Sequence, residues 1–178
     1  MQTFGSLTLQ PALDHPELLG HPVREALSSW EHAGQVQVAE IDSDLAETAA
    51  MTEAYGVPME ASANCVVVMG KRDGQERTAA CVVRADTRAD VNNVVKRTLD
   101  VRKASFLDHD RAVAETGMAY GGITPIGLPA DWRLFVDAAV AEIDLAIIGS
   151  GIRGSKLFLP GELLTRLPGA EMITNLAR

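Results

Sequence analysis

The first third of the chain has the spacing of apolar residues that is typical of two helices separated by a strand. Apolar side chains recur every three or four positions from Pro16 to Ala33, which predicts an amphipathic helix. Val36 to Ile41 alternates apolar and polar residues, as a half-buried strand does. The alanine-rich stretch from Leu45 to Tyr55 predicts a second helix. Residues 1–14 show no periodicity, and we expect them to be loosely ordered.

A β-hairpin is the clearest local prediction. Cys65 to Met69 is an apolar, β-branched run that is typical of a buried strand. Lys71-Arg72-Asp73-Gly74 ends on the Asp-Gly pair that tight hairpin turns favour. Thr78 to Val83 has the pattern of the returning strand. The two cysteines, Cys65 and Cys81, are expected to come near each other across this hairpin.

The rest of the chain continues to interleave helices and strands. The pattern predicts helices over 87–99 and 108–116, an extended segment over 102–106, strands over 132–136, 145–148, 156–159 and 170–173, and short helical turns over 140–143 and 160–167. Because strands and helices do not alternate strictly, we predict an α+β fold with a mixed sheet or a partly closed barrel. No linker or repeat divides residues 1–178, so we expect one domain, with 1–34 as an N-terminal extension and 35–178 as the main body.

Composition and charge narrow the classes of function. The chain of 178 residues is 47% hydrophobic, but no apolar run approaches the roughly 20 residues that cross a bilayer. The N-terminus lacks the basic and apolar regions of a signal peptide, so we expect a cytoplasmic protein. The net charge of −8 argues against broad nucleic-acid binding. Residues 71–111, however, carry ten bases and seven acids, which fits either a local basic face or an ordinary solvated one.

Several chemistries lack the residues that they require. Neither cysteine has a matched histidine, and the chain has no nucleophile elbow, which argues against a serine or cysteine hydrolase. The four histidines form no metal motif. Gly149 to Gly154 spells GxGxxG, but Lys156 to Leu159 then has a strand pattern where a dinucleotide-binding fold requires a helix.

The most distinctive stretch is the glycine- and proline-rich segment from Tyr120 to Pro129. Its paired glycines allow positive φ and close approach of another group. Pro125 stiffens the exit and has no N–H to donate. We expect a rigid loop with bare, outward-pointing backbone N–H groups, which suits a carbonyl oxygen, a phosphate or a ribose hydroxyl. A plain tight connection between two strands is the alternative.

This loop and several other segments resemble the YbaK/ProX family of aminoacyl-tRNA deacylases and prolyl-tRNA synthetase editing domains. The resemblance covers roughly residues 36–176, and the GxxxP loop Gly121 to Pro125, followed by Gly127, is its most specific part. The other matching segments are Ala46–Ala50, Tyr55–Pro58, the hairpin from Val66, Arg102–Ser105, Glu115–Gly117, Gly149–Gly154 and Leu157–Leu159.

The resemblance implies a mixed, barrel-like sheet surrounded by helices, and an enzyme that hydrolyses the ester between a wrong amino acid and the 3′ end of a tRNA. It implies no metal or organic cofactor. Gly121 and Gly122 would provide backbone contacts beside the scissile carbonyl. The implied substrate-binding residues are Ile123, Thr124, Pro125, Gly127, Gly151 and Arg153. Among these, Thr124 is a candidate either to bind a ribose or ammonium group or to cap the loop backbone. Arg153 is either a phosphate ligand or, more simply, a solvated arginine of the turn.

One departure from the family pattern bears on activity. The family has a lysine at the start of the strand after its first helix, and Asn64 takes that position here. Asparagine donates hydrogen bonds but brings no charge. Lys71 is about 23 Å farther along an extended strand, so it cannot replace that lysine. Two readings stay open: an active deacylase that uses Asn64, water and the loop, or a weakened module that binds an aminoacyl or nucleotide-like ligand, or a protein or second copy through the acidic N-terminal region.

Overall fold

Two five-stranded sheets form the framework of the protein. The computed structural model describes residues 1–178. The first sheet has the order β1-β2-β3-β9-β8, and every pair in it is antiparallel. Its strands are β1 (Gln2–Phe4), β2 (Leu7–Pro11), β3 (Gln37–Glu40), β8 (Ala146–Gly149) and β9 (Ser155–Leu159). Residues far apart in sequence therefore lie side by side, since β3 pairs directly with β9.

The second sheet is mixed and has the order β10-β7-β5-β4-β6. Its strands are β4 (Ala63–Arg72), β5 (Gln75–Arg84), β6 (Ala104–Phe106), β7 (Arg133–Asp137) and β10 (Ala170–Ile173). β7 pairs in parallel with both β5 and β10, whereas β4 pairs antiparallel with β5 and β6. The α+β class with mixed pairing is confirmed, and the β-structure is divided between two sheets, neither of which closes into a barrel.

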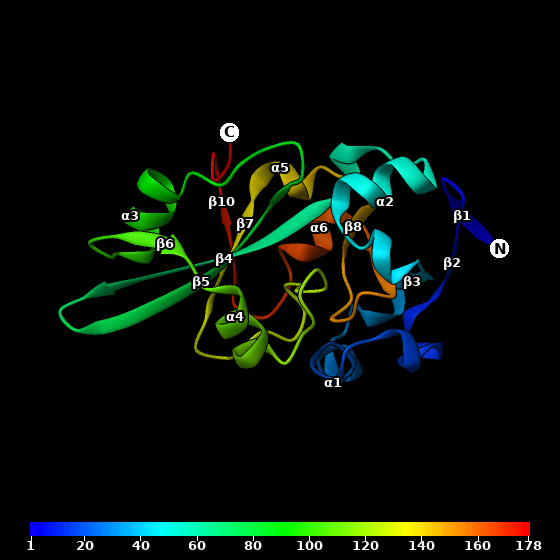
Figure 1. Ribbon diagram of the computed structural model, residues 1–178, viewed down its shortest axis with the longest axis horizontal. Helices are drawn as coiled ribbons and strands as arrows, with labels where there is room; N and C mark the ends of the chain where they lie inside the picture. The colour runs from blue at the N-terminus through cyan, green and yellow to red at the C-terminus, as the bar shows by residue number, and fades with distance from the viewer.

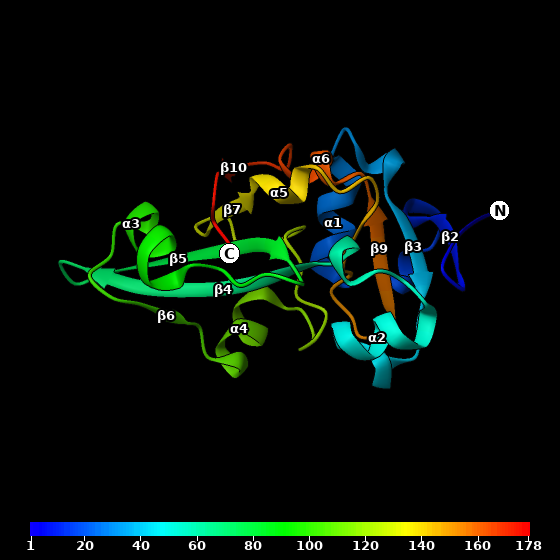
Figure 2. The ribbon, with the colours of Figure 1, turned by 90° about the horizontal axis from the view of Figure 1, so that it is seen from above.

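Six short α-helices surround the sheets. They are α1 (His21–Ser29), α2 (Thr48–Tyr55), α3 (Lys96–Leu99), α4 (His109–Thr116), α5 (Ala138–Ala141) and α6 (Gly161–Leu164). Figures 1 and 2 show α1 and α2 near opposite faces of the first sheet, while the β4–β5 hairpin extends to the far end of the molecule. No helix is long and apolar enough to span a bilayer.

The β4–β5 hairpin confirms the sequence prediction. Asp73 and Gly74 have φ of 51° and 75°, the positive values that a type I′ turn requires. The register pairs Cys65 with Val82 and Val66 with Cys81. Because side chains alternate between faces along a strand, the two thiols are on neighbouring strands but point to opposite faces of the sheet. The expectation that they come near each other therefore holds for their backbones alone.

Three sequence predictions need correction. Residues 1–14 are ordered as the β1–β2 hairpin, in which Leu7 and Leu9 are buried. The helix predicted over 16–33 is a 3₁₀ turn at Pro16–Leu18 followed by α1. The helix predicted over 87–99 begins as a π-helical turn at Val91–Val95, and only its last four residues are α-helical.

Much of the charge in the basic segment 71–111 is neutralised locally. Arg72 and Arg77 both form ion pairs with Asp100, at 2.8 Å each. Arg111 pairs with Glu76 and with Glu115. Ion pairs thus engage five of the ten bases of this segment, and the other five form none: Lys71, Arg88, Lys96, Arg97 and Lys103.

Three large clusters of buried side chains hold the elements together. The main cluster joins both sheets and includes Val23 of α1, Val82 of β5 and Leu157 of β9. A second cluster packs Met51 of α2 against Phe158 on the other face of the first sheet. The third covers the outer face of the second sheet. An isolated parallel bridge between Ser62 and Ile147 brings the start of β4 to β8, and this seam between the sheets positions the site.

Candidate active site

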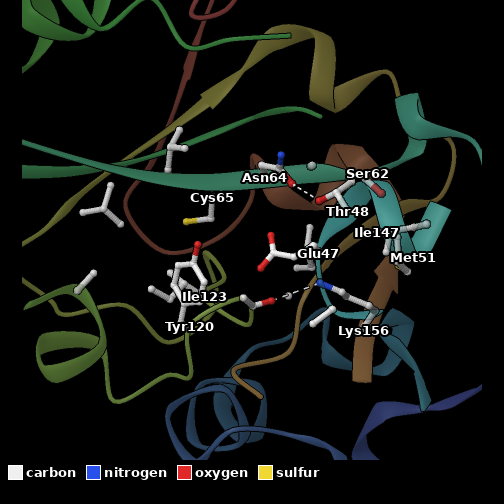
Figure 3. A pocket seen from close by; sticks show the side chains of 18 of the residues that line it. Glu47, Thr48, Met51, Ser62, Asn64, Cys65, Tyr120, Ile123, Ile147 and Lys156 are labelled. Atoms are coloured by element: carbon white, nitrogen blue, oxygen red, sulfur yellow. Dashed lines mark hydrogen bonds between the residues drawn. The ribbon is translucent and has the colours of Figure 1, made fainter. Parts of the chain in front are cut away.

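A pocket of about 310 Å³ opens at the seam between the two sheets. The second sheet contributes the start of β4, and the first sheet contributes β8 and Lys156 of β9. The start of α2, the start of α4 and the glycine loop complete the walls. Figure 3 shows Asn64 and Cys65 on one wall and Lys156 on the opposite one. The site is thus assembled from segments that span about 110 positions of the sequence, from Ala46 to Lys156.

Lys156 is the main functional candidate that sequence reasoning missed. The residue is only 7% exposed, and its Nζ donates a long hydrogen bond of 3.4 Å to the carbonyl oxygen of Gly121. Burial lowers the pKa of the Lys156 ammonium to about 8, with Glu47 opposing this shift and Arg153 adding to it. Lys156 is thus mostly protonated at pH 7 and places a positive charge in a shielded pocket.

The sequence did contain a signal for Lys156. Its neighbours Leu157 to Leu159 are all apolar and predict a buried strand, and a lysine in such a strand is expected to have a partner or a function. Leu157 faces the main cluster, while Phe158 packs in the cluster beneath α2. Lys156 is on the same side of β9 as Phe158, where the edge of that cluster meets the pocket.

Glu47 supplies a carboxylate beside Lys156. It occupies the N-cap position of α2, yet its side chain caps no backbone N–H. Its Oε1 is 3.9 Å from Nη1 of Arg153, and the side chain is 60% exposed. This contact is too long for a hydrogen bond, and no hydrogen bond engages the carboxylate in the structure. In Figure 3 it points into the middle of the pocket, on the same side as Lys156.

Asn64 lines the pocket from β4, on the wall that faces Lys156. Its Oδ1 accepts a hydrogen bond of 3.0 Å from Oγ1 of Thr48, at the start of α2. This bond orients the amide and leaves its nitrogen free to donate to a ligand. Asn64 itself carries no charge, and the positive charge of this pocket comes from Lys156 of β9.

The glycine loop is less bare than we expected. Gly121 has φ of 82° and lines the pocket together with Ile123. The N–H of Gly122, however, donates to the carbonyl of Ala119 at 2.8 Å, which closes a turn. The N–H groups of Gly121 and Ile123 donate to no protein group. Unlike the amide of Gly122, these two amides are therefore not engaged within the protein, and both belong to residues that line the pocket.

The second glycine turn supports the first from behind. Gly151 donates to the carbonyl of Gly122 at 2.8 Å and accepts from Ala119 at 3.0 Å. Arg153 donates from Nη1 to the carbonyl of Tyr120 at 3.0 Å and from Nε to that of Ser43 at 3.2 Å. The guanidinium is therefore committed to holding the loop against the turn that precedes α2.

The structure brings part of the predicted set into the pocket. Asn64, Gly121 and Ile123 line it. The other predicted residues lie outside the lining and support the loop: Gly122, Thr124, Pro125, Gly127, Gly151 and Arg153. Thr124 is fully buried, and its hydroxyl has no hydrogen-bond partner. Thr124 therefore does not line the pocket, where its predicted contact with a ribose or ammonium group would have to be made.

The two ends of the pocket differ in character. Met51, Ile147 and the buried hydroxyl of Ser62, which has no hydrogen-bond partner, lie at the end near α2. Cys65, Ile123 and Tyr120 lie at the other end. An enclosed, mainly apolar end and an aromatic end therefore flank the polar centre at Lys156.

Cys65 lines the pocket, but its chemistry argues against a nucleophile. Apolar surroundings raise the pKa of its thiol far above the ordinary value, and burial raises that of Cys81 to about 12. A thiol attacks as its thiolate, which is scarce here at neutral pH. We expect Cys65→Ala to leave any catalytic rate at this pocket close to wild type. A loss of several orders of magnitude, as for a true nucleophile, would contradict this expectation.

The comparisons with known proteins agree with the fold. The model of the aminoacyl-tRNA editing domain family matches residues 42–167. A proline–tRNA ligase of Listeria welshimeri is 32% identical over 80 residues, which are 44% of this chain and 14% of the ligase. The uncharacterised protein YwhH of Bacillus subtilis is 28% identical over 142 residues, covering 79% of this chain and 86% of YwhH.

Solved structures share the fold at low sequence identity. A crystal structure described as a proposed trans-editing enzyme for prolyl-tRNA synthetase has a TM-score of 0.73 at 17% identity, covering 87% of this chain and 94% of that one. The hypothetical protein APE2540 has a TM-score of 0.76 at 19% identity, covering 89% and 100%. The match of the family model over most of the chain shows that this protein belongs to the aminoacyl-tRNA editing domain family.

Proposed function

We propose that this protein is an aminoacyl-tRNA deacylase that hydrolyses the ester of a mischarged tRNA. The observation that carries the proposal is the buried Lys156 ammonium beside the glycine loop, in the pocket where both sheets meet. Family membership supports the class of substrate. Lys156 brings a positive charge into the pocket that Asn64 also lines, and this supports an active enzyme over a module without activity.

The pocket suits the chemistry of ester hydrolysis. The oxygen of a water molecule forms a bond to the ester carbonyl carbon, and the electron pair of the C=O bond moves to the carbonyl oxygen. When this oxyanion collapses, the bond to the ribose oxygen breaks, and that oxygen takes up a proton in exchange for the one that the attacking water releases. The step that needs help is the formation of the oxyanion, because negative charge develops on an oxygen within a pocket that is shielded from water.

Lys156 and the loop are placed to stabilise that charge. An ammonium acts more strongly in a shielded pocket than in water, because the local dielectric is lower. The unengaged N–H groups of Gly121 and Ile123 provide further donors at the same wall. The loop is anchored by Gly151 and Arg153, so these donors need not be reorganised when the charge develops.

The test is a deacylation assay with purified protein and a panel of mischarged tRNAs. Cysteinyl- and alanyl-tRNA(Pro) lead the panel, and the buried, unpartnered hydroxyl of Ser62 is a reason to add a seryl ester. We expect at least one ester to be hydrolysed faster than in buffer alone. If no member of the panel is hydrolysed at high enzyme concentration, the proposed function is wrong.

Glu47 is expected to bind the α-ammonium group of the aminoacyl ester. Its carboxylate faces the pocket and has no close partner of its own. We expect Glu47→Gln to lower kcat/KM for alanyl-tRNA by about tenfold, the loss of one partly exposed charge-assisted hydrogen bond. The same change should leave hydrolysis of N-acetylalanyl-tRNA unaltered, because that substrate has no ammonium.

The comparison is made at pH 6.5, where Lys156 stays protonated even if loss of Glu47 lowers its pKa further. Glu53→Gln, at an exposed position of the same helix, is the matched control. Equal losses for both substrates would contradict ammonium binding and would mean that Glu47 acts through Lys156.

A further inference from the structure

Two of the residues that line the pocket have exposed aromatic side chains. Phe106 is 63% exposed and Tyr120 is 50% exposed, and both line the pocket. The chain has only eight Phe, Tyr and Trp residues in total. His109 also lines the pocket, and its ring centroid is 4.7 Å from that of Tyr120, with the planes tilted by 43°. We refer to Phe106, His109 and Tyr120 as the aromatic rim.

The backbone beneath the aromatic rim is held in place. Phe106 is paired with Val68 across β4 and β6, and the next N–H, of Leu107, donates to the carbonyl of Val67 at 2.8 Å. The carbonyl of Tyr120 accepts from Arg153. His109 begins α4, which Asp108 caps. The rings are therefore exposed on anchored segments, so a flat ligand that covered them would meet a partly preorganised surface.

We propose that the aromatic rim stacks on the base of the nucleoside that carries the ester, the 3′-terminal adenine of the tRNA. This inference rests on the proposed function. If the ester carbonyl binds beside Lys156, the ribose and base that are covalently attached to it must lie in or near the same pocket. The enclosed end, with Met51 and Ile147, suits an aminoacyl side chain. The aromatic rim offers ring faces, and stacking on aromatic side chains is how proteins commonly hold single-stranded bases.

The first test compares two substrates of which only one can place a base on the rim. Alanyl-tRNA contains the terminal adenosine, whereas alanine methyl ester has the same acyl group and no base. We expect Phe106→Ala and Tyr120→Ala each to lower kcat/KM for alanyl-tRNA by roughly 5- to 100-fold, mainly through a higher KM. Hydrolysis of alanine methyl ester should stay unchanged. Met172→Ala removes an equally exposed side chain from β10 and serves as the control.

The second test needs no turnover. The probe is adenosine whose 3′ oxygen is replaced by an amide-linked alanine, which cannot be hydrolysed as an ester. Stacking on the rim should shift the H2 and H8 resonances of its adenine upfield in the presence of the wild type, and Phe106→Ala with Tyr120→Ala should abolish the shift. A uridine analogue of the same design should bind more weakly, because its base has the smaller stacking surface.

The outcomes separate this inference from the proposed function. If the wild type hydrolyses no tRNA but the adenine resonances shift, the rim binds a base and the deacylase proposal fails. If the wild type is active but neither rim variant changes kcat/KM for alanyl-tRNA, the stacking inference is overturned. Absence of any upfield shift with the wild type also overturns it. Parallel losses on alanyl-tRNA and on alanine methyl ester would overturn it too, because the rim would then shape the pocket rather than bind the base.

Discussion

Replacing Lys156 with methionine is expected to lower kcat/KM for a mischarged tRNA by about 100-fold or more, the usual effect of removing a group that stabilises an oxyanion. The same change should stabilise the fold. Burial lowers the pKa of Lys156 from 10.5 to about 8, so the protonated form costs on the order of 3 kcal/mol in the folded state at pH 7. Deacylation assays and urea unfolding measure the two effects, and an inactive but destabilised variant would contradict this account.

The pH dependence of stability and of activity tests whether Lys156 acts as an ammonium or as a general base. Its folded pKa is depressed, so the unfolded state binds more protons between pH 8 and 10.5, and the wild type should gain stability over that range. If the ammonium stabilises the oxyanion, the rate ratio of wild type to Lys156→Met is largest below pH 8 and falls above it. A general base would give the reverse trend. Lys103→Met, at an exposed position without an ion pair, should change neither property.

A lysine introduced on the opposite wall of the pocket should restore part of the deacylase activity that is lost in Lys156→Met. Asn64 faces the same pocket from β4, at the position where the resemblance to the family expects a lysine. We expect the double variant Lys156→Met with Asn64→Lys to be at least about tenfold more active than Lys156→Met alone, since part of the lost electrostatic stabilisation returns. No recovery in a folded double variant would mean that the charge must come from β9.

Gly149→Ala is the second change with a large expected effect. A Cβ atom at position 149 would lie 2.6 Å from the carbonyl oxygen of Gly122 and 2.8 Å from that of Ile123. Both contacts are with backbone, so the glycine loop would have to move away from β8. We expect a loss of about 1–3 kcal/mol in stability, as for overpacking of a tight interior, together with at least about tenfold lower kcat/KM, because displaced donors no longer meet the oxyanion.

Gly154→Ala is the matched control for this prediction. Gly154 belongs to the same turn between β8 and β9, yet a Cβ atom at this position would have no neighbour within 4 Å, and the φ of Gly154 is not in the left-handed region. We expect this variant to be close to wild type in both assays. If Gly149→Ala matched this control, the close packing of the loop against β8 would have no functional importance.

The local elements could be predicted because neighbouring residues determine them. Asp73 and Gly74 adopt the turn that their sequence favours, and Asp108 and Gly117 cap both ends of α4 as helix signals do. The β1–β2 hairpin could not be predicted in this way. Its ordering depends on the pairing of β2 with β3 and on the burial of Leu7 and Leu9 in the cluster beneath α2, and both are contacts distant in sequence.

The same distinction applies to the site. Asn64, Gly121 and Ile123 were identified from motifs, and each lines the pocket. Lys156 and Glu47 were not, because each acquires its place only when the two sheets meet. A motif also cannot separate residues that line a cavity from those that support it. Arg153 and Gly151 are supporting residues, because they hold the glycine loop from behind the pocket.

The hydrogen bonds of Arg153 connect two parts of the chain that are remote in sequence. A single guanidinium joins the carbonyl of Tyr120 to that of Ser43, so one side chain fastens the glycine loop to the turn before α2. Neither segment can move away from the other without giving up a charge-assisted hydrogen bond. Arg153 therefore acts as a non-covalent cross-link, and any displacement of the loop from this turn requires the rupture of its bonds.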